Sequence, residues 1–255
     1  MSQYAFGAGE MYVTPLQDST GTAITTPTPI KLLDLQEGSL DFSGESKMLY
    51  GQNSFPVAVG IGKRAVSVKV KPARILANGW NTLFFGQTLN SGLVALNTGG
   101  TASAIPATPF TVTVTPPNSG VYAQDLGVID WNGNPMKRVA SAPTTGQYSV
   151  VTATGVYTFA AADTLKNVYI SYQYTATVTG AQKQTVVNQP MGYAPTFRTD
   201  LQVAYLGKFL TISLPQCVAS KMSLGLKNED FAVPEFEFAA FDNGAGQVLT
   251  WSTSE

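Results

Sequence analysis

Few residues in this sequence are of types that carry out chemistry. The chain contains no histidine, which is the commonest general base and metal ligand in proteins. Its single cysteine, Cys217, excludes an intrachain disulfide and has no histidine to activate its thiol. Because Leu214, Pro215 and Val218 are its apolar neighbours, we interpret Cys217 as a small core residue.

The remaining candidates are carboxylates and one glycine-rich segment. Glu229-Asp230 and the pair Glu235 and Glu237 act as acid and base only where a pocket separates their pKa values, and we interpret both pairs as solvated acids. Residues 60–63, Gly-Ile-Gly-Lys, lack the spacing of a phosphate-binding loop, and we interpret them as a hairpin turn. The sequence therefore predicts no catalytic, metal or cofactor-binding residues, and a protein that is not an enzyme.

Charge is scarce along the chain. Hydrophobic residues make up 44% of it and charged residues 12%, about half the usual charged share. Because monomers ordinarily keep apart by displaying charge, this composition suits a protein packed against copies of itself; a monomer with a neutral polar surface is the alternative. With a net charge of −1, the chain lacks the excess of positive charge that tight nucleic-acid binding requires.

Neither a secretory signal nor a membrane-spanning segment is predicted from the sequence. The N-terminus lacks the pattern of a secretory signal, and no run of about 18 apolar residues occurs. We therefore expect a protein that is made and folded in a cytoplasm.

Charge is unevenly distributed, with six acids and two bases in residues 1–60 but five bases and no acid in residues 61–105. We hypothesise that the acidic region of one subunit meets the basic region of its neighbour.

Alternation of apolar and polar residues predicts strands through most of the chain. The clearest segments are residues 39–42, 66–71, 210–214 and 235–240. In the last segment the phenylalanines alternate with glutamates, so we expect the phenylalanine face to pack inward and the glutamate face to meet water.

One helix is predicted over residues 72–85. Pro72 suits the first helical turn, where its missing N–H costs nothing, and Gly86 is placed to end the helix in a left-handed conformation. Gly79 weakens the helix interior, so packing must hold it. The apolar stripe expected to contact a sheet consists of Ile75, Leu76, Trp80, Leu83 and Phe84.

Composition divides the chain into two domains. Residues 17–29 and 90–109 are rich in turn residues, and we interpret the second stretch as a linker. Residues 106–182 contain several short strand patterns and an Asn132-Gly133 hairpin signal, which predict a small β-sandwich, Ig-like in shape only. We expect this sandwich to be an insertion in a discontinuous domain of residues 1–105 and 183–255.

The order of these segments resembles a known family. Residues 35–51, Leu-Gln-Glu-Gly-Ser-Leu-Asp-Phe-Ser-Gly-Glu-Ser-Lys-Met-Leu-Tyr-Gly, resemble the early strand pair of tail tube proteins from long-tailed bacteriophages. Strand-like residues 57–61 and 63–71 and the helix follow in the family's order, and residues 209–251 resemble its closing hairpins. Residues 148–175 resemble the small β domain that many phage tube and decoration proteins carry.

The resemblance implies an all-β fold and a structural function. The fold is a tail-tube-type β-barrel or sandwich with one flanking α-helix, plus the inserted small β-sandwich projecting outward. The function is self-assembly into stacked hexameric rings that form the tail tube of the virion, the conduit for DNA ejection. Expected partners are further copies, other tail proteins such as the tape measure and terminator, and double-stranded DNA in transient passage. A capsid decoration or baseplate protein is the alternative; a carbohydrate-active enzyme is disfavoured.

Two sets of residues follow as candidates in such an assembly. Acids lining a channel repel phosphates, so they would let DNA slide; as an alternative, the same acids lie on an outer or inter-ring surface and pair with the basic band. The candidate lumen acids are Asp34, Glu37, Asp41, Glu45, Glu235 and Glu237. A loop over residues 43–62 and an N-terminal arm over residues 1–16 are expected to contact neighbouring rings, with Tyr4, Phe6, Met11, Tyr12, Lys47, Leu49 and Tyr50 as the candidate contacts.

Overall fold

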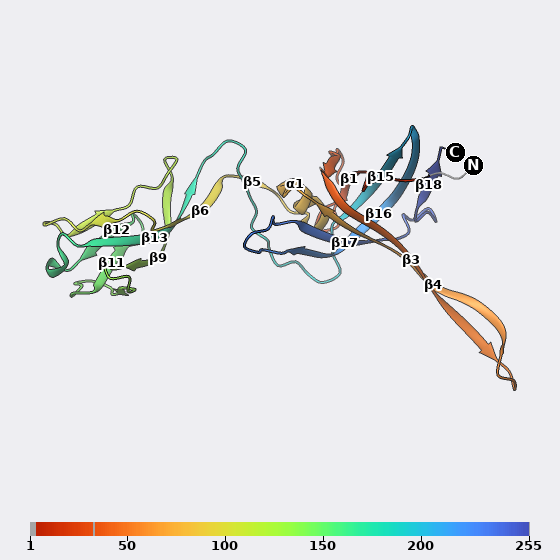
Figure 1. Ribbon diagram of the computed structural model, residues 1–255, viewed down its shortest axis with the longest axis horizontal. Coiled ribbons are helices and arrows are strands. Elements are labelled where there is room, and N and C mark those ends of the chain that lie inside the picture. The colour runs from red at the N-terminus through yellow and green to blue at the C-terminus, as the bar shows by residue number, and fades with distance from the viewer. Residues whose placement is uncertain (1–3, 33, 255) are drawn as a thin grey trace. The chain divides into compact units, whose positions relative to one another are not determined.

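The computed structural model describes residues 4–32 and 34–254. The chain forms two compact units (Figure 1). Unit 1 comprises Met1–Leu89 and Thr185–Glu255, and unit 2 comprises Asn90–Gln184, so the second unit begins well before the expected residue 106. The prediction of a linker over residues 90–109 is wrong, because short strands occupy much of that stretch.

Unit 1 is built around one eight-stranded antiparallel sheet. The strand order is β2-β1-β15-β16-β17-β4-β3, and β18 pairs with the outer part of β16. The strands are β1 (Glu10–Gln17), β2 (Ile30–Leu32), β3 (Leu35–Tyr50), β4 (Pro56–Pro72), β15 (Thr196–Tyr205), β16 (Lys208–Leu224), β17 (Pro234–Ala240) and β18 (Thr250–Thr253).

The sheet of unit 1 has one buried face, as the alternation predicts. Phe236 and Phe238 on β17 are each 1% exposed, and they share a core with Val66, Val68 and Val70 of β4. The expectation that the phenylalanines pack inward is confirmed. Because side chains alternate along a strand, the lysines and glutamates between these residues lie on the opposite face.

A short helical segment covers the core of unit 1, and it starts later than predicted. It consists of α1 (Ala77–Trp80) and a π-helical turn, η1 (Asn81–Phe85). Pro72 does not begin the helix, because β4 continues as far as Pro72 and pairs with β3 there. Gly86 ends the turn with φ 58°, which confirms the left-handed termination.

Unit 2 is a second all-β body with its own core. One sheet contains β10 (Lys137–Arg138), β11 (Gln147–Val151), β12 (Val156–Phe159) and β8 (Thr111–Thr113); the other contains β6 (Leu93–Thr98), β13 (Asn167–Ala176), β7 (Ser103–Ala104) and β9 (Val121–Ile129). β5 (Asn90–Ser91) pairs with β14 (Gln182–Lys183), and η2 (Ala161–Asp163) is a 3-10 turn. Both sheets contribute to one core, in which Tyr157 and Val168 are fully buried.

Both units confirm the expected all-β class. The few helical residues lie in the short turns described above. Within the described residues, no helix has the length and apolar character needed to cross a membrane.

Candidate assembly surface

Half of the β3–β4 hairpin leaves the sheet. β17 pairs with β4 only between Val66 and Val70, and beyond Val66 no other strand in the described chain accompanies the ribbon. We call residues 44–65 the projecting hairpin; all of them except Pro56 are exposed. Figure 1 shows this ribbon extending past the other strands of unit 1.

This hairpin replaces a predicted loop and a predicted turn. The two strands are 16 and 17 residues long, and they stay paired from Leu35 opposite Pro72 to Tyr50 opposite Pro56. The expectation of a loop over residues 43–62 is therefore wrong, and so is the turn over residues 60–63. The true turn is at residues 51–55.

One face of the projecting hairpin is apolar. Strand alternation and the register Met48 opposite Val59 place a set of large side chains together. Each is between 52% and 66% exposed, and the Tyr50 hydroxyl donates a 3.4 Å hydrogen bond to the Met48 sulfur. The set is Met48, Tyr50, Val57, Val59 and Ile61.

The other face of the projecting hairpin pairs long side chains of β3 with small residues of β4. Lys47 lies opposite Gly60, and Leu49 lies opposite Ala58. A Cβ atom on Gly60 would meet nothing within 4 Å, and its φ is not in the left-handed region, so nothing in the folded chain requires glycine there. An isolated two-stranded ribbon is marginally stable in water, and a contiguous apolar patch marks an interaction site. The hairpin therefore has the properties of a segment that a partner covers.

The polar face of the sheet carries an alternating set of charges. Lys69 Nζ lies 2.8 Å from a Glu235 oxygen and 3.6 Å from a Glu237 oxygen, and Lys221 Nζ lies 3.2 Å from Glu237. Lys71 pairs with Glu37 and lies 3.8 Å from Glu235. We call these six residues the charge ladder. Its three acids and three bases balance each other.

The charge ladder contains three of the six candidate lumen acids. Glu37, Glu235 and Glu237 pair with the basic band of their own chain, and the hydrogen bond from Lys69 lowers the pKa of Glu235. Asp34 pairs with Arg74 at the end of β4. Asp41 and Glu45 are exposed, and neither makes an ion pair with another described residue.

The candidate inter-ring contacts fall into two groups. Lys47, Leu49 and Tyr50 are exposed on the projecting hairpin. In the N-terminal segment, Tyr4 and Phe6 are also exposed, and the Phe6 ring lies 5.8 Å from that of Tyr205.

The two candidate contacts on β1, Tyr12 and Met11, differ in exposure. Tyr12 is 40% exposed, and Lys31 lies over its ring. Met11 is 1% exposed, because alternation along β1 turns its side chain into the core beside Val13. The prediction that Met11 contacts another subunit is therefore wrong.

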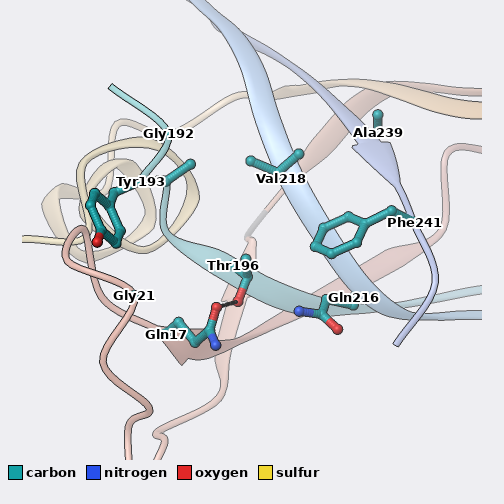
Figure 2. Close-up of a pocket in the computed structure, with 10 residues that line it drawn as sticks. Gln17, Gly21, Gly192, Tyr193, Thr196, Gln216, Val218, Ala239 and Phe241 are labelled. Carbon is teal, nitrogen blue, oxygen red and sulfur yellow. Dashed lines mark hydrogen bonds between the residues drawn. The ribbon is translucent and has the colours of Figure 1, made fainter. Parts of the chain in front are cut away.

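Two hollows in unit 1 were not predicted from the sequence. The first, shown in Figure 2, has a volume of about 480 Å³, with Tyr193 and Phe241 among its walls and the Thr196 hydroxyl donating a 3.1 Å hydrogen bond to Gln17. Its lining residues are uncharged, so it offers no acid–base pair. The second, about 850 Å³, lies at the base of the projecting hairpin between Phe42 and Leu249.

Titratable side chains are buried in both units. Cys217 is fully buried, and burial raises the pKa of its thiol to about 12, which confirms its interpretation as a core residue. In unit 2 the Asp125 carboxylate accepts hydrogen bonds from the hydroxyls of Tyr148 and Tyr157, at 2.8 and 3.0 Å, and lies 3.5 Å from Arg138. Burial raises the pKa of both tyrosines, so they remain neutral donors.

Comparison with known proteins adds no assignment. No protein-family model matches the sequence, and no curated protein matches it.

Proposed function

We propose that this chain is a structural virion protein that assembles with copies of itself into the tail tube of a long-tailed bacteriophage. The observation that carries the proposal is the projecting hairpin, whose two faces and two edges are all open in the single chain. In the proposed assembly, stacked hexameric rings enclose a conduit for DNA, and neighbouring subunits cover the hairpin.

Edge geometry supports growth by addition of copies. The sheet of unit 1 ends at β2 on one side and at β3 on the other. Unpaired strand edges carry free N–H and C=O groups, and joining subunits side by side satisfies them. Contact between different surfaces of identical chains then closes a ring or continues as a filament.

The charge distribution reduces the number of acids proposed to line the lumen. The charge ladder neutralises three of the six candidate acids, Arg74 pairs with Asp34, and Glu45 lies on the projecting hairpin that neighbouring copies would cover. The proposal therefore assigns repulsion of DNA phosphates mainly to Asp41. Tape measure and terminator proteins are the other proposed partners, unit 2 is the proposed outward insertion, and no catalysis is assigned to the chain.

Negative-stain microscopy and sedimentation of the full chain test the proposal. The protein is expected to form rings and hollow filaments. The matched variant replaces residues 47–60 with Asn-Gly, a two-residue turn that joins Ser46 to Ile61, which lie opposite each other in the hairpin. That variant is expected to remain folded and monomeric.

Two results separate the competing functions. A chain that stays small until capsid shells are added is a decoration protein, and one that binds only preformed baseplates is a baseplate protein. The proposal of a tail tube is wrong if the full-length protein stays monomeric at high concentration, even when the other tail proteins are present.

A further inference from the structure

The sheet of unit 1 has two chemically different ends. β17 runs antiparallel to β4, with Ala240 opposite Val66 and Phe236 opposite Val70. The projecting hairpin extends beyond the Val66 end. The loop that enters β17, residues 225–233, therefore lies at the opposite end of the same strands, as Figure 1 shows for the blue segment between β16 and β17.

This second end carries acids beside exposed apolar side chains. We call residues 225–233 the acidic loop. Phe231 is 92% exposed and Leu226 is 77% exposed. Glu229 and Asp230 lie between them, and neither forms an ion pair with another residue in the described part of the chain. The loop also contains one base, Lys227, so two acids outnumber one base there.

The projecting hairpin carries the complementary charge. It contains one acid, Glu45, and three bases, Lys47, Lys63 and Arg64. The three bases make no ion pair within the described residues. Phe231 and Leu226 have no apolar surface to pack against in the single chain, and the exposed valine and isoleucine side chains of the hairpin would provide one.

We infer that the projecting hairpin of one copy docks on the acidic loop of the next copy. The inference rests on the proposed self-assembly and names the surface that the hairpin meets. Both surfaces combine exposed apolar side chains with charged groups, and their net charges are opposite, which favours this pairing over hairpin-to-hairpin contact, where the lysines would repel. Since the two surfaces are different and lie at opposite ends of one sheet, each copy has one of each free and the contact can repeat head to tail.

Charge reversal on each side tests the pairing. Lys63→Glu with Arg64→Glu, or Glu229→Lys with Asp230→Lys, is expected to raise the critical concentration for filament formation at low ionic strength at least about tenfold. A chain carrying all four substitutions is expected to assemble again, close to the native critical concentration. Lys137→Glu with Lys183→Glu, on exposed positions of unit 2, is the control for net charge and is expected to assemble normally.

Cysteine trapping gives a second measurement in the native charge state. A chain with Val59→Cys and Leu226→Cys is expected to form disulfide-linked multimers of increasing length on oxidation, whereas Val59→Cys alone gives at most dimers. The native Cys217 is buried and does not interfere.

The outcomes separate this inference from the proposed function. If reversal of the acidic loop leaves assembly unchanged while reversal of the hairpin blocks it, the hairpin meets another surface and the inference is wrong, although self-assembly stands. If the fourfold variant folds but never assembles, the pairing is also wrong. If the native chain forms no filaments under any condition, the proposed function itself fails.

Discussion

Replacing two apolar residues of the projecting hairpin should weaken assembly without weakening the folded chain. Val59 and Ile61 are 62% and 63% exposed, so Val59→Ser with Ile61→Ser removes little buried surface from the single chain. Exposed substitutions of this kind usually change the free energy of unfolding by less than about 0.5 kcal/mol. The monomer is therefore expected to unfold in urea at nearly the native midpoint.

The effect on assembly follows from the surface that the partner would bury. Full burial of a valine or isoleucine side chain contributes about 1.5–3 kcal/mol. With roughly two thirds of each side chain still available, covering the pair contributes about 2–4 kcal/mol, or about 30- to 1,000-fold in the association constant. Sedimentation across a concentration series is expected to show the critical concentration rise by that factor.

A matched core substitution shows whether the reasoning holds. Val68 is on the same strand, β4, but is 5% exposed. Val68→Ser leaves a cavity and buries a hydroxyl, so it is expected to lower the free energy of unfolding by about 2–4 kcal/mol. If the hairpin variant assembles at the native critical concentration, or if it destabilises the monomer as much as Val68→Ser does, the hairpin is not a partner-covered surface.

Three further predictions concern the folded chain. The pKa of Glu235 is lowered by its hydrogen bond from Lys69, so the carboxylate stabilises the fold above its ordinary pKa; Glu235→Gln should be less stable at neutral pH, and the difference should vanish on acidification in pH-dependent urea unfolding. Gly86→Ala should cost more than about 1 kcal/mol, because φ is positive and the added Cβ would lie 2.5 Å from a proline carbon, whereas Gly60→Ala should be neutral or stabilising in thermal unfolding of the monomer. Tyr157→Phe removes a hydroxyl bonded to a buried carboxylate, and should lower the stability of unit 2 by about 1–3 kcal/mol, as measured by hydrogen exchange.

Sequence patterns predicted the fold where burial alone decides the structure. The alternation around Phe236 and Val68 identified both strands and their buried faces, because one residue of slip would move every core side chain into water. The helix start was wrong for a different reason. Pro72 fits a helical first turn locally, but pairing of β4 with β3 continues through it, and this long-range contact outweighs a local preference.

The projecting hairpin could have been found from the sequence only in part. Val57, Val59 and Ile61 continue the alternation of β4, and this signal was available. Gly60 and Gly62 hid it, because glycine in a strand reads as a turn. Which acids are neutralised was beyond prediction, because the charge ladder joins β16, β17, β4 and β3, and their order in the sheet depends on non-local pairing.

The scarcity of charge has a structural consequence that composition alone does not reveal. Much of the charge on unit 1 is used within the chain: the ladder joins three lysines to three glutamates, and Arg198 pairs with Asp200 on the same sheet. The unpaired bases of the projecting hairpin and the unpaired acids of the acidic loop stand apart from this balance. These charged groups form no ion pairs within the described chain, so they add nothing to its own stability through pairing. Complementary contact between copies would give both sets a partner, and it would cover the apolar side chains beside them.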